Sequence, residues 1–196
     1  ARYAAVASPP AAVARRDAWL DSTRAAGEPL RQPSRWSIVT QLASKNWPTA
    51  EARLAAEAVR DTTTASKRRA FIAGAAFPRA SVKQSYFERY FRDSTLNEDW
   101  VTSSLGAFND ADQSALTLQY LRPALDTLAW VQKNRRIFFL GRWLDAFVTG
   151  HRSPEALAIV DAFLAEHPEL PRDLRQKVLQ VRDDLDRTVR IRSRRW

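Results

Sequence analysis

The stretch that decides the fold class is VKQSYFERYFR, residues 82–92. Its bulky apolar residues recur at a helical spacing and share one face: Val82, Tyr86, Phe87, Tyr90 and Phe91. The polar residues between them are expected on the opposite, solvated face: Lys83, Gln84, Glu88, Arg89 and Arg92. This pattern is typical of an amphipathic α-helix that buries one side against its neighbours.

Helical periodicity continues on both sides of this stretch. Further helices are expected over residues 9–25, from Ser34, over 49–60, 67–77, 97–108, 111–132, 135–149 and 153–168, and from Pro171 onward. Four residues are predicted to cap helix N-termini: Ser34, Thr49, Asn97 and Ser153. Residues 135–149 are the most apolar segment and are expected to be the most buried, with Gly141 allowing two helices to pack closely.

The connections between these helices are short, and no strand is expected. The chain has only 5 Gly but 10 Pro, which fits helices joined by proline-containing corners. Short links make successive helices antiparallel neighbours, as in stacked helix pairs. We therefore predict an all-α fold, an α-solenoid of about ten antiparallel helices in HEAT- or armadillo-like pairs, forming one helical-repeat domain over residues 1–196. No fixed period supports a tetratricopeptide or ankyrin array.

The sequence offers no complete catalytic or metal site. It contains no Cys, no Gly-rich phosphate loop and no G-x-S-x-G motif. The two histidines, His151 and His167, lie too far apart for the H-x-x-x-H pattern of a zinc helix, and we expect both in solvated loops. We therefore predict no catalytic residue, no metal ligand and no cofactor in this chain.

Two clusters of carboxylates have structural explanations. Asp110 and Asp112 fit the start of a helix. The second cluster, residues 183–186, alternates with arginines at spacings that favour ion pairs on a solvated helix.

The net charge of +9 has two possible explanations. It could favour an anionic partner, or it could reflect a bias in composition, which the excess of Arg among the basic residues (26 Arg) indicates. The tail RTVRIRSRRW, residues 187–196, could bind phosphates and stack a base on Trp196, but the C-terminal end of a helix also favours cations. Arg135 and Arg136 are the candidate interaction residues. If Asn134 begins a helix, both cations lie at its positive end, and a carboxylate from a neighbouring helix or from a bound peptide would relieve the repulsion.

The chain begins at ARYAAVASPP without a Met, so we expect a fragment of a longer polypeptide. No apolar run reaches the ~20 residues of a membrane span, and no membrane partner is expected. The compartment stays open between cytoplasm and periplasm, with the cytoplasm slightly favoured.

Most of the chain resembles a known family over residues 35–192. The resemblance rests on three stretches: DTTTASKRRAFIAGAAFPRASVKQSYFERYF (61–91), LNEDWVTSSLGAFNDADQSALTLQYLRPALDTLAWVQKNRRIFFLGRWLDAF (96–147) and SPEALAIVDAFLAEHPELPRDLRQKVLQVRDDLDRTVRIR (153–192). It is to the C-terminal helical domain of the aminopeptidase N family of zinc metallopeptidases. The resemblance implies helix pairs in an arc that leans on a catalytic domain and covers its active site. The zinc motif H-E-x-x-H and the G-x-M-E-N signature of that family are absent here, so no catalytic residue carries over.

The leading hypothesis is therefore a noncatalytic C-terminal domain of a bacterial zinc-dependent aminopeptidase, which covers the active-site chamber and shapes peptide access. Its partners would be the catalytic domain of the parent polypeptide and peptide substrates, and zinc would belong to the parent enzyme. One alternative is a free-standing helical-repeat adaptor that binds acidic peptides or proteins. A less favoured one is a helical protein that binds nucleic acid.

Overall fold

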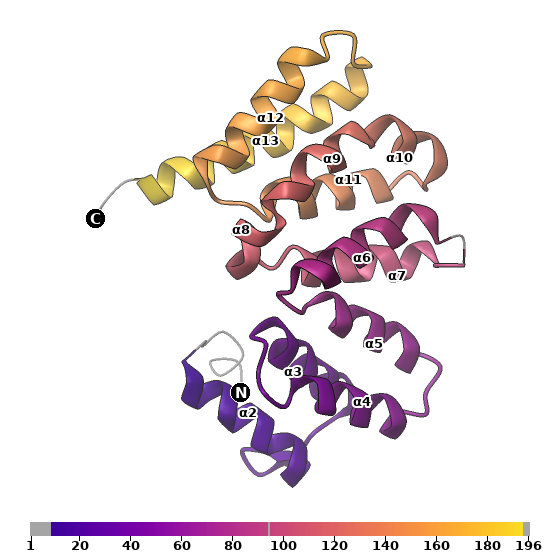
Figure 1. Ribbon diagram of the computed structural model, residues 1–196, viewed down its shortest axis with the longest axis vertical. Coiled ribbons are helices and arrows are strands. Elements are labelled where there is room, and N and C mark those ends of the chain that lie inside the picture. Colours follow the sequence, from indigo (N-terminus) through magenta and orange to yellow (C-terminus); the bar gives the residue numbers. More distant parts are fainter. Residues whose placement is uncertain (1–8, 94, 194–196) are drawn as a thin grey trace. The chain divides into compact units, whose positions relative to one another are not determined.

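The protein is mainly helical, with almost no strand, in a computed structural model that describes residues 9–93 and 95–193 (Figure 1). This confirms the all-α prediction. The chain divides into two compact units, Ala1–Lys83 and Gln84–Trp196. The single domain expected over 1–196 stays a prediction. No helix among the residues described is both long and apolar enough to cross a membrane.

From residue 9 onward, where the structure describes it, the first unit contains four complete helices and one short hairpin. The helices are α2 (Pro10–Ser22), α3 (Gln32–Ser44), α4 (Ala50–Arg60) and α5 (Ser66–Ala75). Between α2 and α3, the strands β1 (Arg24–Ala25) and β2 (Glu28–Pro29) pair antiparallel. The prediction of no strand is wrong here, and α2 ends before this hairpin because Thr23 adopts a left-handed conformation, with φ of 56°.

Helix α3 lies at the centre of the first unit and packs on α2, α4 and α5. It buries Trp36, Ile38, Val39 and Leu42 together with a charged residue, Arg35. Arg35 forms an ion pair of 2.8 Å with Glu57 of α4, whose side chain is also buried. Because each charge is satisfied by the other, both can lie inside this small core.

A second buried carboxylate, Asp61, lies just after α4. It accepts hydrogen bonds from the Trp36 indole at 2.6 Å and from Arg69 at 3.1 Å. Hydrogen bonds from Thr63, and then those from Trp36 and Arg69, hold the pKa of Asp61 well below its usual range. This charged group therefore ties α3 to α5.

Helix α6 (Ala80–Arg92) runs from the end of the first unit into the second. Its apolar stripe forms as predicted, but Lys83 was wrongly placed on the polar face: it is completely buried and donates to the carbonyl oxygen of Ala75 at 2.8 Å. The physical reason is spacing, because Lys83 lies four residues before Phe87 and so shares its face. Its ammonium group also meets the negative end of α5, where cations are favoured.

The rest of the second unit combines several short helical elements with longer helices. Its elements are α7 (Glu98–Phe108), η1 (Ala111–Gln113), α8 (Ser114–Thr117), η2 (Leu118–Tyr120), α9 (Leu121–Asp126), α10 (Leu128–Asn134), α11 (Phe139–Leu144), a π-helical turn η3 (Asp145–Thr149), α12 (Pro154–Glu166) and α13 (Arg172–Ser193). The single helix or helix pair expected over 111–132 is instead a series of five short helical elements, from η1 to α10. Helices α12 and α13 pack on each other along the chain's last part (Figure 1).

Aromatic side chains fill the core of the second unit. The Trp143 ring lies 4.3 Å from Phe147 and 5.3 Å from Phe91, measured between centroids. Tyr90 is fully buried, and its hydroxyl lies 2.9 Å from the Ser104 hydroxyl. Burial raises the pKa of Tyr90 far above its usual value, so this hydroxyl stays protonated.

The helix starts test the capping predictions. Asn97 and Ser153 cap their helices as expected, accepting from Asp99 at 2.8 Å and from Ala156 at 3.3 Å. Ser34 does not cap a helix, because α3 already begins two residues earlier, at Gln32. Pro33 lies in the first turn of α3, where a backbone N–H would have no partner within the helix and proline is therefore tolerated. Thr49 precedes α4, but its hydroxyl donates to Asp17 of α2 instead of capping.

Segment 135–149 is buried along one side of its helical part, over six of its fifteen residues, and is exposed at its start. Phe139, Trp143 and Phe147 are core residues, whereas Ile137 and Phe138 are each 84% exposed. Gly141 is exposed, and a Cβ added there would meet nothing within 4 Å. The prediction that Gly141 permits close helix packing is therefore wrong.

Candidate functional site

The loop between α10 and α11 contains Arg135 and Arg136, the two candidate interaction residues of the sequence analysis. Arg135 follows α10 and donates from Nη2 to the backbone carbonyl of Tyr90 at 2.6 Å. Its guanidinium also lies over the rings of Trp130 and Phe139, at 5.4 and 5.3 Å from their centroids. Arg135 is thus half-buried and serves mainly to hold this loop against α6.

Arg136 is exposed, and its environment differs from the one expected. Asn134 ends α10 rather than beginning a helix, and α11 starts only at Phe139. The backbone N–H of Arg136 donates to Glu98 at 3.1 Å, and Glu98 is the first residue of α7. A carboxylate from a neighbouring helix is therefore present at this turn.

Ile137 and Phe138 make this loop unusual. Both point away from the core because they form the turn that precedes α11, and the helix begins to bury its side chains only at Phe139. Two exposed large apolar residues in sequence, next to the exposed Arg136 and close in sequence to the exposed Arg142, form a surface suited to contact with another protein. We call residues Arg135–Phe138 the α10–α11 loop.

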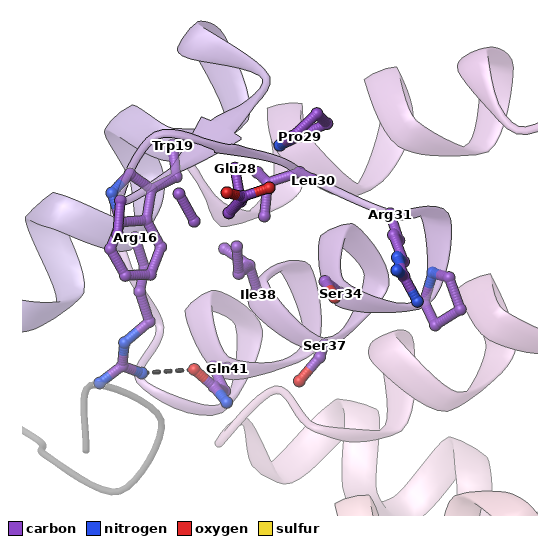
Figure 2. Close-up of a pocket in the computed structure, with 13 residues that line it drawn as sticks. Arg16, Trp19, Glu28, Pro29, Leu30, Arg31, Ser34, Ser37, Ile38 and Gln41 are labelled. Carbon is purple, nitrogen blue, oxygen red and sulfur yellow. Dashed lines mark hydrogen bonds between the residues drawn. The ribbon is translucent and has the colours of Figure 1, made fainter. Parts of the chain in front are cut away.

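A cavity of about 590 Å³ lies in the first unit, between α2, the hairpin and α3 (Figure 2). Arg16 and Trp19 project from the same side of α2, since they are three residues apart. Ser34, Ser37, Ile38 and Gln41 line it from one face of α3. Glu28, Pro29 and Leu30 border it from the hairpin and the segment that follows.

Three charged residues line this cavity, and Arg16 is only 5% exposed whereas Glu28 and Arg31 are exposed. Figure 2 shows its guanidinium turned toward Gln41, whose side-chain oxygen accepts a hydrogen bond from Nη1. Burial lowers the pKa of Arg16 from its usual value, which is the effect of removing water from a cation. No pattern in the sequence points to this site, because Arg16 stands beside Arg15 in an ordinary helical pattern.

The hairpin wall of the cavity is set by backbone conformation. Its two turn residues, Ala26 and Gly27, have φ angles of 49° and 87°, as a two-residue hairpin of the type I′ class requires. Arg24 donates to the Gly27 carbonyl from Nε at 2.9 Å and from Nη2 at 2.6 Å. These bonds hold the turn closed at the edge of the cavity.

The remaining sequence candidates lie apart from these sites. Asp110 accepts from the backbone of Asp112 at 3.0 Å, which confirms its role at a helix start. The acidic cluster of α13 forms ion pairs, including Arg190 with Asp186 at 2.8 Å. The Arg-rich tail continues α13 to Ser193, and its last three residues, 194–196, lie outside the described part of the chain.

The two histidines do not form a metal site. His151 was expected to be solvated, but it is only 2% exposed, and burial lowers its pKa to about 4. His167 lies 3.2 Å from Glu169. Within residues 9–93 and 95–193, no group of three His, Cys, Asp or Glu side chains could hold a metal ion. The described residues therefore do not fit a zinc centre.

Comparison with known families identifies the fold. Residues 1–187 match the family described as the ERAP1-like C-terminal domain. The chain belongs to this family. The family is the C-terminal helical domain of the M1 aminopeptidases, so the resemblance seen in the sequence is confirmed. A search of curated proteins found no match.

Membership in the ERAP1-like C-terminal domain family makes this a noncatalytic type of domain, and it implies association with a catalytic domain.

Proposed function

We propose that the chain is the noncatalytic C-terminal domain of a zinc-dependent aminopeptidase, where it covers the active-site chamber and controls which peptides reach it. The observation that carries this proposal is the family match over residues 1–187. The zinc and the peptide-cleaving groups would lie in the catalytic domain of the same polypeptide. Consecutive helix pairs such as α3 with α4, and α12 with α13, support a HEAT- or armadillo-like stacking.

We assign the contact with the catalytic domain to the α10–α11 loop. Ile137 and Phe138 supply apolar anchors that a partner surface can bury, and Arg136 supplies a charge at the rim. Glu98 and Arg135 fix the loop, so little conformational entropy is lost when a partner binds it.

The noncatalytic role is tested by assaying the chain alone against amino-acid anilides, with and without zinc. We expect no turnover above that of buffer under either condition. Turnover that depends on zinc and disappears with a chelator would overturn the proposal.

The assigned contact is tested by co-expression with the catalytic part of the same polypeptide. Replacing Ile137→Ser and Phe138→Ser together should weaken the association by about tenfold or more, since buried apolar anchors dominate such interfaces. The matched control is Val59→Ser in the first unit, an equally exposed apolar residue at 83% exposure. Equal weakening by both changes would show that the α10–α11 loop has no special role.

A further inference from the structure

The function proposed above makes no use of the cavity between α2, the hairpin and α3. Its volume of about 590 Å³ lies within the range of roughly 300–1,000 Å³ typical of small-molecule sites. Much of its wall is apolar and comes from Trp19, Pro29, Leu30, Pro33 and Ile38. A cavity of this size with an apolar wall and a few polar groups is the usual form of such a site.

Two opposite charges line this cavity from the segment that joins the hairpin to α3. Glu28 begins β2 and Arg31 directly precedes α3, and both side chains are exposed. Within residues 9–93 and 95–193, these two side chains form no hydrogen bond or ion pair, either with each other or with another residue. The third charged residue, Arg16, already donates to Gln41 and has further interactions. The charges open to a ligand are therefore those of Glu28 and Arg31.

This pair of charges matches a ligand that carries both signs. An ammonium group pairs with the Glu28 carboxylate, and a carboxylate group matches the flat guanidinium of Arg31 with two hydrogen bonds. The two residues are three positions apart, so their Cα atoms are separated by at most about 11 Å. A small zwitterion can therefore contact both side chains, whereas a ligand with a single charge would leave one of them unmatched.

The apolar wall favours a flat ring between these charges and the helices. Trp19 is half-buried on α2, and Ile38 is buried on α3. In Figure 2, the Glu28 carboxylate lies on the side of Trp19, and Arg31 lies farther along the segment that leads into α3. Aromatic rings gain from offset or edge contacts with an indole beyond the area that they bury.

We propose that this cavity binds a free aromatic amino acid, with its ammonium group on Glu28, its carboxylate on Arg31 and its ring against Trp19 and Ile38. Because exposed ion pairs contribute little, we expect a Kd near about 1 mM. The proposal needs only the first unit and is independent of the aminopeptidase assignment. A failure of one would therefore leave the other standing.

The test is a titration of the whole 196-residue chain with L-phenylalanine, followed by calorimetry and by the assigned indole N–H signal of Trp19. Two comparison ligands each lack one charge: 3-phenylpropionate has no ammonium group, and 2-phenylethylamine has no carboxylate. We expect saturable binding of phenylalanine with a shift at Trp19. The affinity for each comparison ligand should be weaker by about threefold or more, because each loses one ion pair.

Variants assign each charge to its residue. Glu28→Gln should remove the preference for phenylalanine over 3-phenylpropionate, and Arg31→Gln should remove the preference over 2-phenylethylamine. The matched controls are Glu51→Gln and Arg15→Gln, at exposed positions outside the cavity, and both preferences should stay within about twofold of the original. All four positions are exposed, so the variants should keep the fold, which circular dichroism checks.

Three results would overturn the proposal. The first is equal affinity for phenylalanine and either comparison ligand. The second is an unchanged preference in Glu28→Gln or in Arg31→Gln. The third is the absence of saturable binding up to about 20 mM phenylalanine, a concentration at which even a millimolar site would fill.

Discussion

Two glycines of the second unit show how surroundings decide the effect of a single residue. Gly141 lies in α11 with open space where a Cβ would be. At Gly150, a Cβ would approach the Ala146 carbonyl oxygen to 2.5 Å and the backbone of Asn109 to 3.2 Å. The same substitution should therefore have opposite effects at the two positions.

We expect Gly141→Ala to raise the free energy of unfolding by up to about 1 kcal/mol, because alanine loses less backbone entropy in a helix. Gly150→Ala should lower it by about 1–3 kcal/mol through overpacking. Urea denaturation followed by circular dichroism measures both. A lower free energy of unfolding for Gly141→Ala would contradict the open space found at the position of the added Cβ.

His151 makes stability depend on pH. Its pKa is about 4 in the folded chain and near 6.5 when unfolded, so the unfolded chain binds the proton more tightly. Stability is therefore retained above about pH 6.5 and falls as the pH drops toward 4. At pH 5 we expect a loss of about 2 kcal/mol from this group.

The measurement is the difference in free energy of unfolding between pH 7 and pH 5, compared in the original chain and in His151→Gln. Between pH 7 and pH 5, the free energy of unfolding of His151→Gln should fall by about 2 kcal/mol less than that of the original chain. This difference does not depend on the stability of the variant at pH 7. An identical pH dependence in both proteins would contradict the burial of a neutral His151.

At the scale of elements, charged side chains join the helices of the first unit. The buried pair of Arg35 and Glu57 connects α3 to α4, while Arg79 and Glu51 form an exposed pair at another position of α4. Their different exposure predicts very different contributions to stability.

We expect Glu57→Gln to lower the free energy of unfolding by about 3–5 kcal/mol, because it leaves the Arg35 charge buried without its carboxylate. Glu51→Gln, the matched control on the same helix, should change it by less than about 1 kcal/mol. The double variant Arg35→Met with Glu57→Leu should lower the free energy of unfolding by less than Glu57→Gln alone, because it leaves no buried charge without a partner. Equal losses for Glu57→Gln and Glu51→Gln would argue against a buried pair.

At the scale of the whole molecule, 31 basic residues outnumber 22 acidic ones to give a net charge of +9, but arginines on several helices are paired with carboxylates. Arg53, Arg122 and Arg182, on three different helices, each contact carboxylates. Such a distribution predicts weak, sequence-independent attraction to nucleic acid instead of a dedicated site.

We therefore expect binding to a DNA duplex, followed by fluorescence anisotropy, to be detectable only at low ionic strength and to be lost by about 150 mM salt. Submicromolar affinity that persists at that salt concentration would favour the nucleic-acid alternative over the aminopeptidase domain.

Much of the secondary structure could be predicted, because its signals are local. Asn97 and Ser153 cap helices through bonds to residues two or three positions on, and the stripe of α6 follows from spacing alone. Predictions failed where a distant segment intervened: the Thr49 hydroxyl binds Asp17 of another helix, and Lys83 is buried against the end of α5.

The helical class, most helix positions and the family can be inferred from the amino-acid sequence, since periodicity, capping and distributed similarity are local properties of the chain. Which polar groups lose contact with water depends instead on how the helices pack in three dimensions. Arg16, Glu57 and His151 look like surface residues in the sequence, yet they are buried because residues far along the chain cover them. Burial is a property of neighbours in space, and it sets both the pKa of His151 and the chemistry of the Arg16 cavity.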